Sequence, residues 1–534
     1  MSRKREKSSP VVWMVLLAVL AVTIIFAAIL GPRRALSIGA ASALSTLVDD
    51  LHEPDAPHRL RVLEVEVDEA HIEALNSDLP WSGGQQGEAA VLLNGVRYPA
   101  KFRYRGALTP SHFLGEKRSF RLTFKDPPPQ LPFKKVNVIN PKSFNMLNNH
   151  MGLWIGGFMG VRVPHHELVQ VRLNGKELGV MELYEQPTGD FEEVRGSALG
   201  QVPVYKGDFG PVSDRKLGSR KLLWTDAAHW QYESKADSVT ANVRLKALVG
   251  ILGDRRMSME LRRDSLTRLL DVDQYLRYLA AIWVVNTSHI DQYHNQFLVF
   301  DPRDQRFRPI LWDALLMYEQ PGRPRYFIHD ALAYWMLQVP EWRLQRDRYA
   351  WQALLVLHDE GRFLQRWSQE EQRLLPSLLM DKNKYANVTL FAEDVHRYSV
   401  VHAASSSASM RAGVNDYWDQ LQDRIAACQV RQVRSGNELM LTTEDECPVI
   451  VSWPVNDTVS VAVVGEGRTF QVERLNGTER VVIHRTVHCS GPAPDPFLPG
   501  QHFEVDPLQV TLNFVPAIPP GLRITNAITD EAVQ

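Results

Sequence analysis

Apolar and polar residues alternate with a period of two along the early part of the chain. The run RVLEVEVD at 61–68 places Leu and Val on one face and mostly Glu on the other, which is typical of a half-buried strand. Asn94-Gly95 and Asn174-Gly175 each lie between two strand-like runs, and Asn-Gly favours a tight hairpin turn. With a helical pattern over 145–160, this predicts a β-rich, antiparallel sheet lobe at 59–190.

The period then lengthens to that of a helix. Leu and Tyr fall on one broad face of residues 264–285, which predicts either a pair of core-facing helices or one long helix. Residues 333–430 show the same pattern, so we expect a mainly helical lobe over 191–432. From about residue 435 short strands return between Pro and Gly residues, which predicts an appended β-sandwich-like domain at 433–534.

Residues 11–30 contain no charged residue, Gly or Pro. A helix of that length spans ~30 Å, the hydrocarbon thickness of a bilayer, so we expect a single transmembrane helix; the alternative is a cleaved signal peptide. The basic arm at 1–10 would stay cytoplasmic. A linker at 31–58 would then lead to a main domain outside the cytoplasm, periplasmic or extracellular, on the cell membrane or in the cell envelope.

Composition narrows the functional classes. Hydrophobic residues make up 44%, charged residues 23%, and the formal net charge is −2, so the chain is neither disordered nor strongly basic, and we expect no nucleic-acid partner. Three cysteines exclude a disulfide-built scaffold. Two alternatives remain for them: Cys447 pairs with Cys489 and leaves Cys428 over, or all three stay unpaired.

The richest pattern lies in residues 286–319. Two strand-like runs flank a turn near Arg303, and in this hairpin Asn295 would face roughly Leu311. Asp291, Asn295 and Asp313 would then meet at its open end. Their oxygens are ligands that Mg²⁺ prefers, and their order matches the acids and Asn of protein kinases. The alternative is a set of turn caps and solvated loop residues.

Two histidines flank this cluster, at His289 and His294. For each, a structural histidine with its hydrogen bonds satisfied is the favoured interpretation, and a metal ligand or proton carrier is the alternative.

Several short motifs resemble, in order, the spore-coat protein H (CotH) kinase-like family. They are RYRG at 103–106, EKRSFRLTF at 116–124, VQVRLNGKELGVMELYEQ at 169–186, VYKGD at 204–208 and IDQYHNQFLVF…FRPILWD at 290–313. The resemblance covers about residues 60–430. It implies an α+β, atypical protein-kinase-like fold with two lobes that uses ATP and Mg²⁺.

The resemblance also implies a role for each matching residue. Asp291 would be the catalytic Asp near the acceptor hydroxyl, and Asn295 and Asp313 would hold Mg²⁺. Lys117 would contact the ATP phosphates, with Arg105 as a helper and Lys206 as the second choice. Tyr184 and Glu185 would lie near the lobe junction, where the nucleotide base would bind.

The chain departs from the family pattern after Asp313. Ala314 and Leu315 stand where the family has an apolar residue and a second Asp, and Met181 stands where it often has Tyr. Two hypotheses follow. One is a membrane-tethered kinase that transfers the ATP γ-phosphate to protein Ser/Thr hydroxyls. The other is a non-catalytic, pseudokinase-like envelope scaffold that binds a partner protein or glycan.

Overall fold

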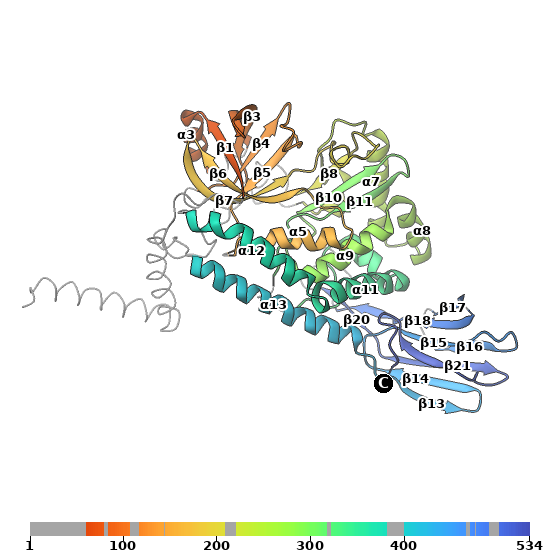
Figure 1. Ribbon diagram of the computed structural model, residues 1–534. Helices are drawn as coiled ribbons and strands as arrows, with labels where there is room; N and C mark the ends of the chain where they lie inside the picture. Colours follow the sequence, from red (N-terminus) through yellow and green to blue (C-terminus); the bar gives the residue numbers. More distant parts are fainter. Residues whose placement is uncertain are drawn as a thin grey trace, which may run out of the picture.

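A computed structural model of the 534-residue chain shows a barrel, a group of helices and a set of C-terminal strands (Figure 1). The structure describes residues 60–79, 84–106, 117–141, 143, 145–208, 221–317, 322–381, 400–465, 470–475, 477–490 and 501–533.

The predicted β-rich N-terminal lobe is a closed barrel, and not all of its strand pairings are antiparallel. Its strands are β1 (Arg61–Val67), β2 (Gly87–Leu93), β3 (Val96–Tyr104), β4 (Phe120–Phe124), β5 (Lys135–Ile139), β6 (His166–Leu173) and β7 (Lys176–Glu185), in the order β1-β2-β3-β4-β5-β7-β6. A parallel pairing of β1 with β6 closes the ring. Closure lets the apolar face of every strand enter one core that includes Val65, Phe102 and Leu122, so no strand edge is left open.

The two predicted hairpins of the barrel are confirmed. Asn94-Gly95 joins β2 to β3, and Asn174-Gly175 joins β6 to β7. All four residues have a positive φ, as the central residues of this tight turn require. The short helix α3 (Glu69–Ser77) follows β1, and the Asp68 side chain caps it by accepting from the Ala70 amide.

The predicted helix at 145–160 is α5 (Asn148–Phe158), and the long helical part begins after β9. That part contains α7 (Val239–Gly253), α8 (Met259–Leu269), α9 (Val272–Val285), α10 (Ala331–Leu337), α11 (Pro340–Leu354), a π-helical turn (Leu355–Asp359), α12 (Arg362–Met380) and α13 (Val400–Ala426). Of the two alternatives for residues 264–285, the helix pair is correct, because the Asp271 side chain caps a new helix at α9 by accepting from Gln274 N.

A four-stranded sheet lies beside the barrel (Figure 1). Its strands are β8 (Val204–Gly207), β9 (Trp230–Tyr232), β10 (Gln296–Asp301) and β11 (Arg306–Ile310), in the order β11-β10-β8-β9. The predicted hairpin is therefore present, but its register is shifted by one residue, since Asp301 pairs with Arg306 and Phe297 with Ile310. By extension Asn295 lies opposite Trp312 rather than Leu311.

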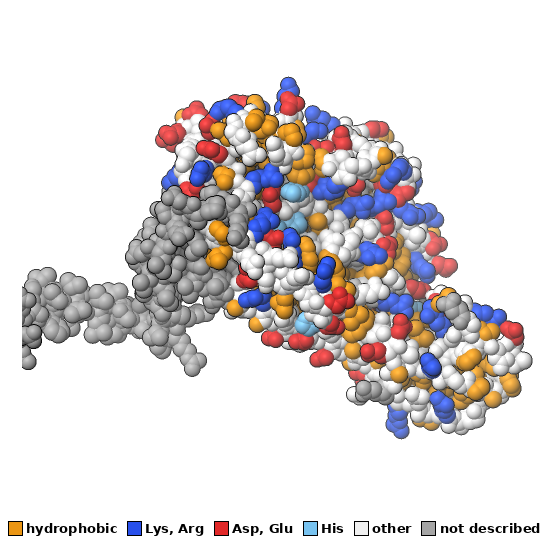
Figure 2. Space-filling view, viewed as in Figure 1, with side chains coloured by type: hydrophobic (Ala, Val, Ile, Leu, Met, Phe, Trp, Pro, Cys, Tyr) orange, Lys and Arg blue, Asp and Glu red, His pale blue; other side chains and the backbone are white. Residues whose placement is uncertain are grey.

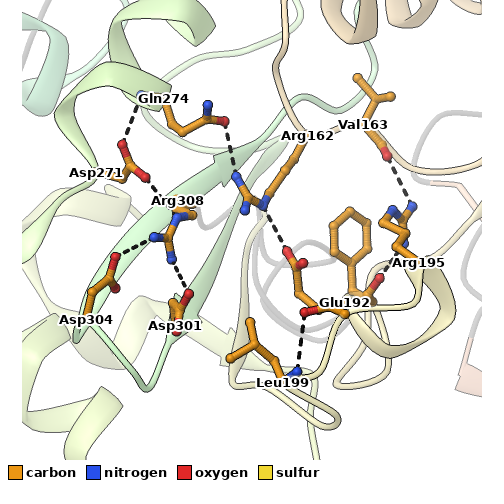
Figure 3. A network of polar contacts seen from close by, with 12 residues as sticks. Arg162, Val163, Glu192, Arg195, Leu199, Asp271, Gln274, Asp301, Asp304 and Arg308 are labelled. Carbon is orange, nitrogen blue, oxygen red and sulfur yellow. Dashed lines mark hydrogen bonds and ion pairs between the residues drawn. The ribbon is translucent and has the colours of Figure 1, made fainter.

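A charged network fixes this hairpin against α9 (Figure 3). Arg308 on β11 binds Asp271 at the start of α9 at 2.9 Å and Asp301 on β10 at 2.8 Å, and it also binds Asp304 in the turn. Beside it, the backbone oxygen of Arg162 accepts from Leu311 N at 2.8 Å. The end of β11 is thus held from two sides.

The C-terminal residues form the predicted succession of short strands. They are β13 (Arg431–Ser435), β14 (Glu438–Thr443), β15 (Val449–Pro454), β16 (Ser460–Val464), β17 (Phe470–Leu475), β18 (Thr478–Ile483), β19 (Val487–Cys489), β20 (His502–Val505), β21 (Leu508–Val515) and β22 (Arg523–Asn526). Two four-stranded sheets, β13-β14-β21-β16 and β17-β18-β15-β22, share a core that includes Trp453 and Phe514. A third sheet joins β19 and β20 to β12 (Tyr326–Phe327), which precedes α10.

Both alternatives for the cysteines are wrong. Cys428, two residues after the end of α13, is bonded to Cys447 with a Cα–Cα separation of 5.7 Å, and Cys489 is a free thiol in β19. The sequence could not reveal this, because Cys489 belongs to the third sheet while Cys428 and Cys447 both border the core of the other two.

The predicted membrane-spanning helix at 11–30 lies outside the described residues. Among the helices that the structure describes, none combines the length and the apolar character needed to cross a bilayer. The longest two, α12 with 19 residues and α13 with 27, both carry charged side chains along their length. The prediction of a single-pass membrane protein therefore finds no support. The fold is corrected to a mixed α/β architecture with a seven-stranded barrel and several further sheets.

Candidate active site

The open end of the β10–β11 hairpin brings together Asn295 and Asp313, two of the three residues that its register predicted there. The Asn295 side-chain amide donates to Asp313 Oδ2 at 3.1 Å and to the His289 carbonyl at 2.9 Å. Both Asn295 and Asp313 have a positive φ, of 60° and 52°. Such backbone costs on the order of 1–3 kcal/mol in a residue with a side chain and gathers at functional sites.

Asp291 lies in the loop that enters β10, and one of its carboxylate oxygens is held firmly. Oδ1 accepts from Tyr293 N at 2.7 Å, from His294 N at 3.0 Å and from His294 Nδ1 at 2.7 Å. Burial opposes ionisation, but these bonds and the charge of His294 outweigh it and lower the pKa of Asp291. The side chain remains 36% exposed, so the carboxylate is both fixed and accessible.

His289 does for Asp313 what His294 does for Asp291. His289 Nδ1 lies 2.9 Å from Asp313 Oδ2. The sequence favoured structural histidines at these positions, and the structure shows that each of them orients one aspartate of the cluster. They are therefore part of the site's framework.

Glycines in α5 explain how Asp313 comes so close to that helix. A Cβ at Gly152 would overlap the carbonyl oxygen of Ala314, and one at Gly156 would overlap the Leu311 side chain. These two glycines lie one turn apart and together admit the segment 311–314 against the helix. Ala314, which precedes the position where the family pattern has a second Asp, is completely buried at this contact.

The outer face of the barrel forms the other side of the site. On β4, Phe120 and Leu122 enter the barrel core, so Lys117, Ser119 and Arg121 share the opposite face. In the pairing of β4 with β3, Arg121 lies opposite Arg103. Further along, the Arg105 guanidinium lies 6.0 Å from the ring centre of Trp312, the residue before Asp313.

Arg121 is a buried cation whose hydrogen-bond partners are neutral. Its guanidinium donates to Asn137 Oδ1 at 2.7 Å and to Gln186 Oε1 at 2.6 Å. Burial, followed by the charges of Arg103 and Arg105, lowers the pKa of Arg121. The acids Glu233 and Asp208 raise the pKa of Arg121 more weakly.

Lys206 on β8 belongs to the same neighbourhood. It forms an ion pair with Asp208 at 2.5 Å. Burial lowers the pKa of Lys206, Asp208 raises it, and Arg121 and Arg105 lower it. Because Gly207 pairs with Gln296, Lys206 and Asp208 flank the strand end that carries Asn295.

Lys117 is on this face but is occupied. Its amine binds Asp381 Oδ2 at 2.6 Å, and both side chains are completely buried. The same oxygen accepts from Val180 N at 2.8 Å. Asp381 ends α12 and approaches the barrel where Gly179 has no side chain, since a Cβ there would overlap the carboxylate.

Tyr184 and Glu185, the predicted base-site pair, face different surroundings. The Tyr184 hydroxyl accepts from Asn149 at 2.9 Å, and its ring meets Trp312 edge-on at 6.2 Å. Burial, then the charges of Glu182 and Asp313, raises its pKa. Glu185 instead binds Arg195 at 2.5 Å and accepts from His165 N at 2.9 Å, so Tyr184 borders Asp313 while Glu185 supports the fold.

The donor set of the cluster suits a hard cation that brings other ligands with it. No group of three or more His, Cys, Asp and Glu side chains that could hold a metal occurs within the described ranges. Asn295 and Asp313 offer an amide and a carboxylate oxygen. Mg²⁺ usually takes only one or two carboxylates and completes its shell with phosphates and water, so these residues fit it.

Sequence reasoning missed three residues of this region: Arg121, Asp208 and Asp381. Arg121 had a usable signal, because it lies four residues after Lys117 and a strand places such residues on one face. Asp208 follows Lys206 within a motif already recognised. Asp381 had none, since 264 residues separate it from Lys117.

The charges on this face of the molecule are mixed. Figure 2 shows Lys and Arg side chains interspersed with Asp and Glu, and His side chains in the band between the barrel and the helices.

Comparison with known proteins identifies the family of this chain. The family model described as CotH kinase protein matches residues 102–425. The chain belongs to the CotH kinase family. The match begins on β3 and ends in α13, so it covers both sides of the site and leaves the C-terminal strands outside the CotH kinase region. The chain is also similar to the inner spore coat protein H of Bacillus subtilis (strain 168), 25% identical over 231 residues. That match covers 42% of this CotH kinase family member and 60% of the relative.

Proposed function

We propose that this protein is a kinase that uses ATP and Mg²⁺ to phosphorylate Ser or Thr hydroxyls of a protein substrate. The observation that carries the proposal is the proximity of a cation on the barrel to the predicted metal ligands. The Arg105 guanidinium on the barrel lies 6.0 Å from the ring centre of Trp312, the residue before Asp313, which is in contact with Asn295 at 3.1 Å. Kinase-like function is what membership of the family suggests.

The barrel side suits a polyanion. Arg103, Arg105, Arg121 and Lys206 lie near one another, and the acids that act on Arg121 are Glu233 and Asp208. A triphosphate would add negative charge beside these cations, and guanidinium–phosphate hydrogen bonds are among the stronger ones in proteins. Tyr184, which burial keeps neutral, would border this site from β7.

The hairpin side suits the transfer step. Bound Mg²⁺ would neutralise charge on the phosphates, and Asn295 and Asp313 are the residues that would hold it. Asp291 would orient the acceptor hydroxyl and take its proton, while the bond from the γ-phosphorus to ADP breaks and a bond to the hydroxyl oxygen forms. Because three donors fix Oδ1 of Asp291, this carboxylate is positioned before the substrate arrives.

The alternative is a non-catalytic binding or scaffold protein. Lys117, the family's expected phosphate lysine, is fully buried against Asp381, and Ala314-Leu315 lacks the second acid. On this reading the site binds a nucleotide or another anion without turnover.

Measurements of Mg-ATP binding and of phosphate transfer distinguish the kinase from the scaffold. A ligand at 100 times its Kd stabilises a protein by about 2.7 kcal/mol, so Mg-ATP is expected to raise the melting temperature. Asp313→Ala is expected to abolish the shift, and Asp304→Ala, in the same hairpin but at its turn, is the matched control. Labelled ATP then decides: transfer that Asp291→Asn abolishes supports the kinase, binding without transfer supports the scaffold, and no binding contradicts both nucleotide readings.

A further inference from the structure

The C-terminal β region, residues 431–533, is built into the helical part rather than attached to it. Phe503 on β20 belongs to the same apolar core as α9 and α11, not to the core of the two C-terminal sheets. Its ring stacks on Tyr334 of α10 with a centroid distance of 5.3 Å. Arg343 of α11 also donates to the carbonyl of Arg485 at 2.5 Å.

The strand β20 pairs with segment 322–330, which follows Asp313 in the chain. Tyr326 pairs with Phe503 and Phe327 with His502, and Ile328 N donates to the Gln501 carbonyl at 2.9 Å. Segment 322–330 therefore has its strand partner in the C-terminal region. A side-chain contact adds to this, because Arg325 lies 3.8 Å from Glu446, which also binds Arg424 at 2.9 Å.

Segment 322–330 in turn contacts the loop that carries Asp291. Asn286, a buried residue that ends α9 with a positive φ of 56°, is the bridge. Its side chain donates to the Met317 carbonyl at 3.1 Å and accepts from Arg323 N at 3.4 Å. Further along, burial lowers the pKa of His329, and the charges acting on it include those of Asp330, Arg323 and Asp291.

We propose that the C-terminal β region serves the site directly. Its strand β20 holds segment 322–330 against the loop 286–291, and this keeps Asp291 in place. The family match ends at residue 425, so it assigns no role to this region. The consequence for phosphate transfer rests on the proposed function, whereas the structural coupling does not.

A pair of matched substitutions in the full chain tests the coupling. Phe503→Leu loosens β20 from Tyr326 and Tyr334, whereas Phe514→Leu makes the same change in the core of the two C-terminal sheets, where Phe514 meets Trp453. We expect Phe503→Leu to speed amide hydrogen exchange in residues 322–330 and 286–295 by about tenfold. Phe514→Leu should leave both segments unchanged.

A milder pair covers the case in which Phe503→Leu fails to fold. Glu446→Gln weakens the contact with Arg325, and Glu473→Gln, whose partner Arg480 lies within the C-terminal region, is its control. Faster exchange at 286–295 in Glu446→Gln alone supports the proposal. Unchanged exchange at 286–295 when 322–330 loosens overturns it, as does an equal change in both members of a pair.

Activity gives the second readout. Phosphate transfer should fall in Phe503→Leu and stay unchanged in Phe514→Leu, because only the first variant loosens segment 286–295, which carries Asp291 and Asn295. If the unaltered protein transfers no phosphate, the kinase proposal fails, and hydrogen exchange alone still decides whether the C-terminal region holds the Asp291 loop.

Discussion

The barrel and the β10–β11 hairpin hold the charged groups of the candidate site in different ways. On the hairpin side, Asp291 and Asp313 are each bound by a histidine from the same short stretch of chain. On the barrel side, Arg121 has only neutral hydrogen-bond partners, and Lys117 is paired with an acid 264 residues away. One side is assembled locally, and the other depends on contacts between distant parts of the fold.

This difference predicts that some of these residues matter for the stability of the fold and others for nucleotide binding. The Lys117–Asp381 pair is completely buried, and its attraction is needed to offset the desolvation of both charges. Arg121 and Arg105 instead lie near other cations, so an anion would gain from them. We therefore expect Lys117 to matter most for folding and the arginines to matter most for nucleotide binding.

The largest effect should come from breaking the buried pair. Lys117→Met or Asp381→Leu alone leaves an uncompensated buried charge, which costs about 3–5 kcal/mol. In the double variant the charge is gone from both positions, so most of that loss should be recovered. Urea unfolding of the four proteins measures this as a double-mutant cycle.

An additive cycle would contradict that expectation. It would mean that the two residues do not act on each other and that Lys117 is available to a ligand. Glu66 on β1 and Arg97 on β3 form an exposed ion pair. A cycle of Glu66→Leu and Arg97→Met is the matched control, because exposed pairs contribute only about 0–1 kcal/mol.

The same difference explains what the sequence could predict. The convergence of Asn295 and Asp313 follows from one hairpin and a period of two, so a register error of a single residue did not destroy it. The partner of Lys117 lies on α12, and no local pattern connects them. The barrel likewise closes through a parallel pairing of β1 with β6, which alternation along each strand does not reveal.

Arg121→Gln should weaken nucleotide binding more than it weakens the fold. Hydrogen bonds to charged groups contribute about 1.5–3 kcal/mol, which corresponds to roughly a 10- to 100-fold rise in the Kd for Mg-ATP. Titration with a fluorescent nucleotide would measure it. Arg172→Gln, on β6 with Glu177 as its partner, should leave the Kd unchanged, and equal losses in both variants would argue against an anion site at Arg121.

Gly152→Ala should displace Asp313 without touching its hydrogen bonds directly. The added methyl group would overlap the carbonyl oxygen of Ala314, and overpacking of this kind costs about 1–3 kcal/mol. The Mg-ATP melting shift should shrink as well. Gly250→Ala is the control, because this glycine lies inside α7 with open space at its Cβ position and should gain up to about 1 kcal/mol of helix stability.

The smallest effect should come from His294→Phe, which tests how firmly the hairpin side is fixed. It removes the 2.7 Å bond to Asp291 Oδ1 but keeps both backbone donors, from Tyr293 and residue 294. The cost to the free energy of unfolding should be about 0.5–1.5 kcal/mol. Phosphate transfer should slow while the Kd for Mg-ATP stays constant, and His294→Asn, which can still donate, should recover part of the rate. If His294→Phe weakens nucleotide binding as much as it slows transfer, Asp291 does not act on the acceptor alone, and the barrel and the hairpin are less independent than their contacts indicate.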